Sequence, residues 1–465
     1  MPLHTTSMVT LRSSSRALEQ GFDRIKRQAL HWVYEGYPVG DYYEAALPNR
    51  DAFCMRDTSH QCTGAEVLGL SSHNFNMFRK FAASMTEARD YCALWEIDRY
   101  DRPCPVDWTN DADFWYNLPA NFDMLHALWR MYEWTGDTRY LKDGAMEEFC
   151  ARTVEDYIAR WDRDGDGLPD RRASEGRRGL ASYDESDYAE RYLVGCDLLA
   201  SMARAHLSYS AMCRASGRRE QAAIYGKRGQ ALMAKLHDEW YEPGRGYASA
   251  LGTDRKLLFS EDQHYSQSLL YWDAAGDIAR ANECTSYMIG RMDGAIIESL
   301  SHYPELLWRY GKPDAAMRAL ERLMDPACYR KEYPEASFSA VGAVATGMMG
   351  IRPERADCAG NVLDGMGRIS TRASLAGVDW VELDHVPVLG GEISVRHEGD
   401  SRTLFAREMG ESVIWRAAFD GECAINVNGA RVPATVAVDE FSGRTYTYAD
   451  IEVRAGEEHI AERVM

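Results

Sequence analysis

The stretch NFDMLHALWRMYEWTGDTRYL, residues 121–141, decides the fold class of this chain. Its Phe122, Leu125 and Trp129 recur at steps of three and four, the spacing that places apolar side chains on one face of a helix. Gly136 then ends the helix, because glycine enters the left-handed conformation without strain, and a polar residue starts the next helix at once. The stretch therefore predicts a helical hairpin with a short turn.

The same pattern, a helix ended by glycine and followed at once by a new helix start, recurs through residues 14–350. It predicts helical hairpins in series. The other helix breaks fall at Gly69, Gly217, Gly276 and Gly311. The connections at the opposite end of the hairpins are long and rich in Gly, Pro, Asp, Trp and Tyr: 37–62, 90–116, 161–186 and 241–263. This asymmetry indicates a closed helical toroid with its function on the long-loop end. An open helical solenoid is the alternative, but it would repeat more regularly than these glycines do.

After about residue 372 the apolar period changes to two, which indicates short strands. The sequence VNGARV, residues 427–432, carries the Asn-Gly pair that is typical of a hairpin turn. We therefore expect a toroid over residues 14–357 and a small C-terminal antiparallel β-sandwich over residues 372–465. The boundary between them is expected near residues 358–370.

The composition limits the partners. The chain has 53 basic and 72 acidic side chains and a net charge of −19, which repels nucleic acids and anionic membranes. We expect a small neutral substrate. Twelve Trp and 26 Tyr would suit flat sugar rings, although most aromatic side chains fill cores.

The sequence predicts a cytoplasmic protein. No apolar run approaches the roughly 18 residues of a membrane span, and the N-terminal residues lack the apolar core of a secretory signal. The eleven cysteines are scattered without a C-x-x-C pair, which favours reduced thiols. The oligomeric state is left open.

Two early loops concentrate polar side chains. In AFCMRDTSHQCTGAE, residues 52–66, the chemistry falls on Arg56, Asp57, His60 and Gln61. Residues 102–123 interleave carboxylates with aromatic rings, the pattern by which proteins hold sugars, at Asp107, Trp108, Asp111, Asp113 and Trp115. Helix-start chemistry, in which these acids cap the helices that follow, is the alternative for both loops.

Two later segments supply further acids. LASYDESDYAERYLVG, residues 180–195, sets Asp184 and Glu185 beside Tyr183, with more acids than the next helix needs. Two YPE sequences carry Glu305 and Glu335, and Glu332 lies just before the second, in KEYPEASFSAVGAV. Pro followed by Glu is also a good helix start. The helix that Glu335 opens is almost wholly apolar and small. We therefore expect it to be buried, with the carboxylate of Glu335 facing a pocket.

Carboxylates among aromatic rings, without a phosphate loop or a Cys/His metal spacing, favour chemistry on glycosidic bonds. That reaction needs one protonated carboxylic acid at the leaving oxygen and one ionised carboxylate as base or nucleophile. Burial or a neighbouring charge raises the pKa of the acid.

These residues also resemble a known family. The serial hairpins, DGDGLPD followed by SYDESDY, the CMRDTSHQ loop and the late Glu before a buried helix are similar to the six-hairpin (α/α)6-toroid glycoside hydrolases. That family includes processing α-glucosidases, trehalases, glucoamylases and α-L-rhamnosidases. The trailing β-region resembles the C-terminal sandwich of rhamnosidase-type enzymes. The resemblance spans about residues 20–350 as pattern more than identity.

The resemblance implies roles for particular residues. It places the general acid at Asp184, with Glu185 as the rival, and the general base at Glu335, with Glu332 as the rival. Arg56 and Asp57 resemble the pair that binds the terminal sugar. The full expected sugar-binding set is Arg56, Asp57, His60, Gln61, Asp107, Trp108, Asp111, Asp113, Trp115, Tyr183 and His264.

The turn ARWDRDGDGLPD, residues 159–170, begins like a calcium loop with Asp162, Asp164 and Asp166. An EF-hand loop needs a bidentate Glu at its twelfth position, which here is Ala173. We therefore expect no metal and no cofactor, with a calcium site of another kind at these three aspartates as the alternative. The aspartates then shape the turn that delivers Asp184.

Taken together, the expected protein is an inverting, exo-acting glycoside hydrolase for a small neutral glycoside or oligosaccharide. Two alternatives stay open. One is a sugar epimerase or polysaccharide lyase on the same toroid, using histidine or tyrosine for proton transfer. Its candidates are His60, His264, His302, Tyr265 and Tyr303. The other is a carbohydrate-binding protein without catalysis.

Overall fold

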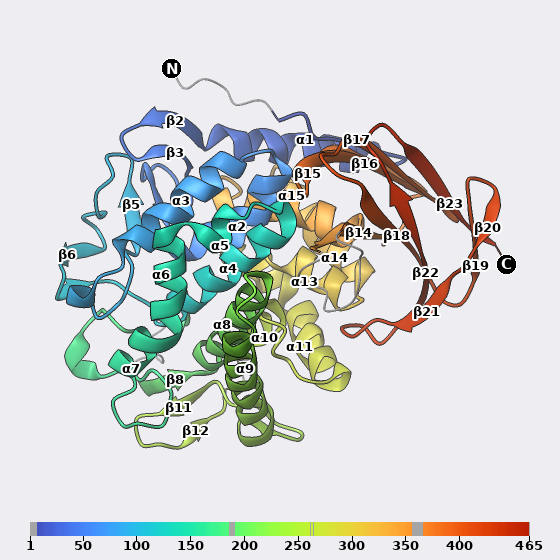
Figure 1. Cartoon of the computed structure of the whole chain (residues 1–465). Coiled ribbons are helices and arrows are strands. Elements are labelled where there is room, and N and C mark those ends of the chain that lie inside the picture. Colours follow the sequence, from blue (N-terminus) through green and yellow to red (C-terminus); the bar gives the residue numbers. More distant parts are fainter. Residues whose placement is uncertain (1–6, 186–190, 261, 264, 356–365, 465) are drawn as a thin grey trace.

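The computed structural model describes residues 7–185, 191–260, 262–263, 265–355 and 366–464 (Figure 1). A ring of six helices forms the inside of its helical part, and each inner helix contacts the next. The last contacts the first, so the ring is closed. The inner helices are α2 (Met55–Val67), α4 (Pro119–Thr135), α8 (Cys196–Ala215), α10 (Tyr265–Tyr271), α13 (Tyr303–Arg309) and α15 (Pro334–Ala343).

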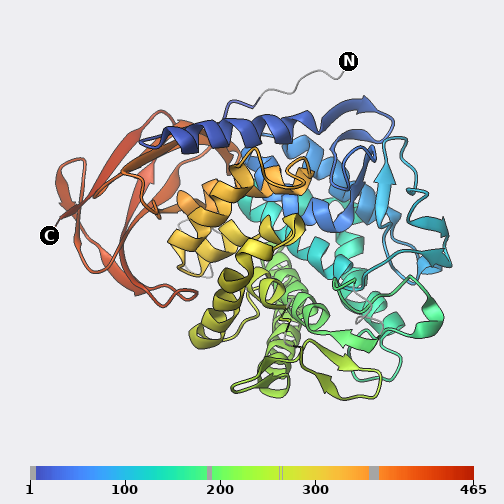
Figure 2. The ribbon, with the colours of Figure 1, turned by 180° about the vertical axis from the view of Figure 1, so that it is seen from behind.

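Each inner helix is preceded in the chain by an outer one, which makes six hairpins. The outer helices are α1 (Arg16–His31), α3 (Ser71–Ser84), α6 (Gly144–Arg152), α9 (Arg219–Glu239), α11 (Ile278–Arg291) and α14 (Pro313–Met324). Short helices α5 (Arg139–Lys142), α7 (Ile158–Trp161) and α12 (Ile297–Leu300) lie in the connections. Figure 2 shows the hairpins from behind, with α8 and α9 side by side. The predicted closed toroid is confirmed.

Sequence explains why the ring closes. All ten residues of α15 are buried, as expected for its small apolar side chains. At its contact with α2, a Cβ placed on Gly64 would lie 1.9 Å from the backbone oxygen of Phe338. Two inner helices can approach this closely only where one of them lacks a side chain. The glycines predicted to end helices all have positive φ: Gly69, Gly136, Gly217, Gly276 and Gly311.

Small strand pairs stiffen the long connections that the sequence presented as loops. They are β2 (Val33–Tyr37) with β3 (Gly40–Tyr43), β4 (Ala52–Cys54) with β5 (Glu96–Asp98), β6 (Trp108–Asn110) with β7 (Asp113–Phe114), and β9 (Tyr241–Glu242) with β10 (Gly246–Tyr247). A three-stranded sheet joins β8 (Tyr192–Gly195), β11 (Ala250–Gly252) and β12 (Leu257–Leu258).

The C-terminal part is a sandwich of two sheets beside the toroid (Figure 1). One sheet has the order β1-β15-β16-β17-β23-β19-β20, and the other β13-β14-β18-β22-β21. The pairs are antiparallel except β14 with β18, which run parallel. The strands are β1 (Thr10–Ser13), β13 (Arg352–Glu354), β14 (Gly367–Arg372), β15 (Trp380–Val388), β16 (Gly391–Glu398), β17 (Ser401–Glu408), β18 (Val413–Asp420), β19 (Ala424–Val427), β20 (Ala430–Val432), β21 (Thr435–Val438), β22 (Thr445–Val453) and β23 (Glu458–Val464).

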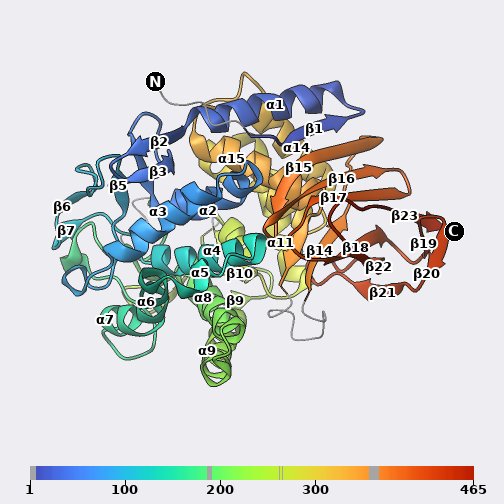
Figure 3. The same ribbon diagram turned by 45° about the horizontal axis from the view of Figure 1, so that its top comes forward.

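The sandwich includes a strand from the opposite end of the chain. Strand β1 pairs with β15 in the register Thr10 to Asp384, and Figure 3 shows β1 and α1 beside this sheet. The predicted division into residues 14–357 and 372–465 stays a prediction, since residues 356–365 lie outside the described part. Strands β1, β13 and most of β14 nevertheless join the sandwich from outside residues 372–465.

Two further properties concern the chain as a whole. Through the described residues, no helix is both long and apolar enough to cross a membrane. The described cysteines are all free, and most of them are buried.

Candidate active site

A cavity of about 390 Å³ lies where the inner helices begin, at the end of the toroid that carries the long connections. Five of the inner helices contribute a residue from their first half or from just before it, and α10 also contributes its last residue, Tyr271. The residues involved are His60 of α2, Asp197 of α8, Tyr265 of α10, His302 just before α13 and Glu335 of α15. The loop before α8 adds Ser182, Tyr183, Asp184 and Glu185. The prediction of a polar pocket on the long-loop end thus has a concrete candidate.

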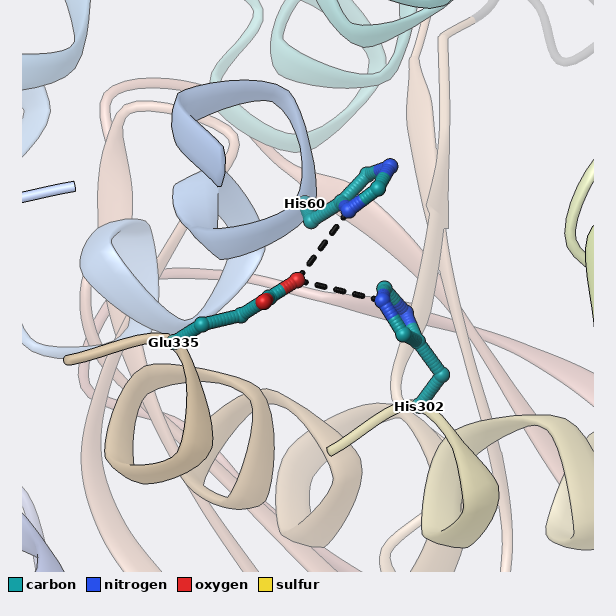
Figure 4. A group of neighbouring side chains, drawn as sticks. All are labelled: His60, His302 and Glu335. Carbon is teal, nitrogen blue, oxygen red and sulfur yellow. Dashed lines mark hydrogen bonds and ion pairs between the residues drawn. The ribbon is translucent and has the colours of Figure 1, made fainter. Parts of the chain in front are cut away.

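Glu335 is held between two imidazoles at the wall of this cavity (Figure 4). Its Oε1 lies 3.0 Å from His60 Nδ1 and 3.1 Å from His302 Nε2, and the carboxylate is 3% exposed. Burial alone would raise the pKa of Glu335, but the hydrogen bonds and charges of His302 and His60 lower it well below its usual range. Glu335 is therefore an ionised carboxylate at neutral pH.

His60 lies between two carboxylates. Its Nε2 is 2.9 Å from Asp123 Oδ2, on the side away from Glu335. Burial lowers the pKa of His60, but Asp123 and Glu335 more than offset this and raise that pKa to about 9. An imidazole with a carboxylate at each nitrogen donates from both, so His60 carries a positive charge.

The two residues of the predicted sugar-binding pair, Arg56 and Asp57, occupy different places. Arg56 lines the cavity, whereas Asp57 is buried behind it and accepts a 3.0 Å hydrogen bond from Tyr333 Oη. Burial and the nearby charge of Glu335 raise the pKa of Asp57. Gln61 is fully buried in α2 and does not line the cavity.

Asp184 and Glu185, the two candidate general acids, differ in their hydrogen-bond and ion-pair partners. Arg56 Nη1 lies 2.9 Å from Glu185 Oε1, so Glu185 is engaged in an ion pair. The Arg56 guanidinium also lies over the rings of Trp95 and Tyr183, at 5.6 and 5.3 Å. Asp184 accepts a 3.2 Å hydrogen bond from Tyr192 Oη.

Buried Asp197 fixes the loop that carries Asp184. Its Oδ2 accepts hydrogen bonds from Ser182 Oγ at 2.9 Å and from the Tyr183 backbone N–H at 2.6 Å. The Asp184 backbone N–H donates to Ser182 Oγ at 2.9 Å. Burial raises the pKa of Asp197 to about 6. Asp197 carries no distinguishing signal in the sequence, since it follows the acids of residues 184–190 as one more helix-start residue.

The second predicted loop does not line this cavity in the described structure, so a sugar-binding role for its residues stays a prediction. Asp111 pairs with Arg89 at 2.8 Å and Asp113 with Arg177 at 2.9 Å. Trp115 Nε1 donates to Asn117 Oδ1 at 2.9 Å. Asp107 lies 3.5 Å from Arg50, and Trp108 belongs to the β6–β7 pair. In the described chain none of the five lines the cavity, and the carboxylates of Asp111 and Asp113 pair instead with arginines distant in sequence.

Two predicted residues remain, and the structure describes one of them. Glu332 is exposed and absent from the described lining, so geometry favours Glu335 of the two candidate bases. His264 lies outside the described residues.

Among the described residues, three groups of side chains have the composition of a metal site. In each group the ligand atoms lie within 4.8 Å of one another: His60, His302 and Glu335; Asp162, Asp164 and Asp166; and Glu96, Cys104 and Asp107. In the first group, the N–O separations of 3.0 and 3.1 Å are ordinary hydrogen-bond lengths. In the second, Asp162 accepts from the backbone N–H groups of Gly165, Asp166 and Gly167 at 2.9–3.1 Å, and Arg255 pairs with Asp164.

Solved structures with similar folds are carbohydrate-active proteins. The α-L-rhamnosidase from Dictyoglumus thermophilum matches with a TM-score of 0.65 and 11% identity, over 99% of this chain and 50% of that one. The α-L-rhamnosidase from Aspergillus terreus matches with a TM-score of 0.61 and 13% identity, over 97% and 51%. A putative kojibiose phosphorylase from the human microbiome matches with a TM-score of 0.57 and 8% identity, over 96% and 63%.

The chain thus spans about half the length of these two rhamnosidases. Its sequence matches no family model and no curated protein. The structural similarities confirm the fold expected from the resemblance, the six-hairpin toroid with a C-terminal β-sandwich.

Proposed function

We propose that the protein is a glycoside hydrolase that removes a terminal sugar from a small neutral glycoside by inversion. Asp184 donates a proton to the leaving oxygen, and Glu335 accepts a proton from the attacking water. One observation carries the proposal: a single cavity is lined both by Glu335, kept ionised by two imidazoles, and by Asp184 on a loop held in place by Asp197.

The imidazoles of His60 and His302, which hold Glu335 between them, support its assignment as the general base. A general base must be ionised in the free enzyme and must lie where water and substrate meet. Glu185 is a weaker candidate for the acid than Asp184, because its ion pair with Arg56 favours the charged form. An inverting mechanism predicts about 6.5–9.5 Å between the two carboxyl groups.

The shape of the cavity supports action on a chain end. Tyr271, Trp272 and His302 line it toward the inside of the ring. Tyr271 Oη accepts a 2.9 Å hydrogen bond from Arg130, which lines a second cavity at the other end of the inner helices. The Tyr271–Arg130 contact therefore lies between the two cavities, which supports binding of a chain end more than passage of a polymer through the ring.

The charge of the cavity supports a neutral substrate. In the described lining, Arg56 is the one guanidinium or ammonium group, and it is paired with Glu185. The lining carboxylates are Asp184, Glu185, Asp197, Asp262, Glu298 and Glu335. The positive charge of His60, which also lines the cavity, is already paired with Asp123 and Glu335, so a sugar with a carboxylate, sulfate or phosphate group would meet an excess of carboxylates here. The same argument disfavours phosphorolysis, since inorganic phosphate would have to bind beside Glu335.

The proposed chemistry needs no cofactor and no resident metal, because two carboxyl groups suffice for it. Free cysteines through the described chain support work in a reducing compartment such as the cytoplasm.

The test is a panel of aryl glycosides and oligosaccharides, with the anomer of the released sugar read by NMR. The expected result is turnover of one neutral terminal sugar with an inverted product, at a rate that Asp184→Asn and Glu335→Gln each lower by about 10²–10⁴-fold. Retention of configuration, or hydrolysis unchanged in either variant, would refute the assignment. Sugar binding without turnover across the panel would leave a carbohydrate-binding protein.

A sugar epimerase is the second candidate, and the paired imidazoles of His60 and His302 favour it. Their ring centroids lie 4.6 Å apart at 85°, beside the cavity. Histidines so placed could move a proton on a sugar carbon. Incubation with reducing sugars in D₂O separates the two: an epimerase places solvent deuterium on carbon, and a hydrolase does not. A lyase would instead release an unsaturated product.

A further inference from the structure

Asp123 lies beneath the cavity without lining it. It is fully buried, at 0% exposure, in an otherwise apolar stretch of α4. Three side chains that do line the cavity donate hydrogen bonds to its carboxylate. They are His60 Nε2 at 2.9 Å, Tyr183 Oη at 3.1 Å and Trp272 Nε1 at 3.4 Å. These donors come from α2, from the loop before α8 and from the residue after α10, so one carboxylate ties three separate segments together.

A carboxylate in this place needs a specific reason. Burying an ionised group is costly unless hydrogen bonds and an opposite charge compensate for the lost water. Asp123 has three donors, and the opposite charge is His60 itself. A core built for stability alone would place an apolar side chain here, as the neighbouring Phe122 and Met124 do.

We infer that Asp123 is a positioning residue of the cavity: it holds the His60 imidazole with Nδ1 toward Glu335 and fixes the rings of Tyr183 and Trp272 as walls. The inference rests on the proposed function for its kinetic consequence only. The geometry requires a proton on His60 Nε2, because the carboxylate of Asp123 offers only acceptors. That fixes which way the imidazole ring faces. Residues that orient a catalytic group in this way improve the precision of a site without touching the substrate.

If Asp123 positions the site, a substitution at Asp123 should lower kcat much more than it changes KM. Asp123→Asn keeps the size of the side chain and an oxygen for Tyr183 or Trp272, but it removes the charge opposite His60. The amide can also turn its NH₂ group toward His60 Nε2, which reverses the polarity of that hydrogen bond. We expect kcat to fall at least tenfold with KM changed less than threefold, and Asp123→Glu to restore part of kcat.

A matched control separates positioning from stability. Glu66 is a buried carboxylate on α2, at 1% exposure, that accepts from Ser71 and Asn74 and does not line the cavity. Glu66→Gln is expected to change the melting temperature without changing kcat. Equal losses of kcat in Glu66→Gln and Asp123→Asn at equal stability would overturn the inference.

A measurement without turnover keeps the inference testable if no glycoside is cleaved or Asp123→Asn fails to fold. In ¹⁵N-labelled wild-type protein, with His60→Gln to assign the signals, the His60 Nε2 resonance should show a bound proton throughout pH 6–8. A bare His60 Nε2 in that range overturns the inference whatever the enzyme does. A protonated Nε2 together with an inactive panel sustains the positioning role and refutes the proposed function.

Discussion

The Arg56 guanidinium lies 2.9 Å from Glu185 Oε1, and this ion pair makes the two adjacent acids of the 184–185 loop unlike each other. A tyrosine hydroxyl is one partner of Asp184, and Glu185 pairs with a cation. Neighbours in sequence can thus be assigned separate roles by their surroundings, as in enzymes where two carboxyl groups divide the acid and base tasks.

The first prediction concerns that difference. Asp184→Asn should lower kcat/KM for an alkyl or unactivated aryl glycoside by about 10²–10⁴-fold, because no proton reaches the leaving oxygen. The loss should shrink for a dinitrophenyl glycoside, whose leaving group needs no proton. Glu185→Gln should cost less than about tenfold, as expected for a partly exposed ion pair. Steady-state kinetics on both substrates decide; a larger loss in Glu185→Gln would exchange the two roles.

The second prediction concerns the base. Glu335→Gln should lower kcat by about 10²–10⁴-fold, because an amide cannot accept the proton of water. Glu332→Gln is the matched control, since Glu332 is exposed three residues earlier in the chain and is expected to leave kcat unchanged. Circular dichroism and thermal melts establish that both variants fold. Comparable kcat values for the two variants would contradict the assignment of Glu335.

The third prediction is a dependence of stability on pH. The folded-state pKa of His60 is about 9 and its ordinary value 6.5, so the folded protein holds this proton more tightly than the unfolded chain. The resulting stability is fully present below pH 6.5 and is lost as the pH rises through about 9. The groups that set it are Asp123 and Glu335 at the two ring nitrogens, with His302 and Asp57 nearby.

Urea unfolding at intervals of half a pH unit between 6 and 9.5 measures this loss in free energy. His60→Gln should have a flatter profile over that window. His126→Gln serves as the control, because burial lowers the pKa of His126 well below its usual range and keeps it neutral throughout. A wild-type profile as flat as that of His60→Gln would count against a charged His60.

The fourth prediction concerns metal removal. With a carboxylate at each ring nitrogen, the charged His60 has no lone pair left for a cation. Dialysis against EDTA and then 1,10-phenanthroline should leave both kcat and the melting temperature unchanged. Activity that is lost on chelation and restored by one equivalent of Zn²⁺ would instead identify His60, His302 and Glu335 as metal ligands.

The fifth prediction concerns the closure of the ring. Gly64→Ala should destabilise the protein by about 1–3 kcal/mol or more, because the new methyl group would meet the Phe338 carbonyl oxygen. The strain would also move α2 against α15, the helices that carry His60 and Glu335. Gly290→Ala, in exposed α11 with nothing within 4 Å of its Cβ position, should stabilise by about 0.5–1 kcal/mol. Chemical denaturation compares the two; a neutral Gly64→Ala would contradict the close approach.

The fold was predictable because its signals are local. Apolar spacing of three and four, glycine at Gly136 and its counterparts, and a later period of two are each contained within a few residues. Closure of the ring needed one more inference, the contrast between short turns and long connections. The strand β1 escaped prediction because four residues pair with a strand near the other end of the chain.

A residue of the cavity could be predicted only where the local sequence itself causes its position there. Glu335 was found because it opens a helix too apolar to be exposed. For this residue the two sequence readings, helix start and pocket, are both correct, since the inner helices begin at the cavity. The place of the carboxylates of residues 107–113 could not be read from the sequence, because Arg89 and Arg177, which pair with two of them, are not adjacent in sequence.

Asp123 could not be predicted for a related reason. In NFDMLHALW it is one acid in the early part of a helix, where an acid is ordinary. Its meaning comes from His60, Tyr183 and Trp272, which no local pattern connects with it.

The pairing of β1 with β15 bears on how the protein can be divided. A fragment ending near residue 357 would keep Thr10–Ser13 but lose residues 381–384, and the backbone groups of β1 would become an unprotected sheet edge. Removing β1 as well would uncover Val381 and Leu383 from the other side. A piece suited to expression or crystallisation should therefore keep β1 and β15 together, and truncation between the helical part and the sandwich would favour aggregation over an independent toroid.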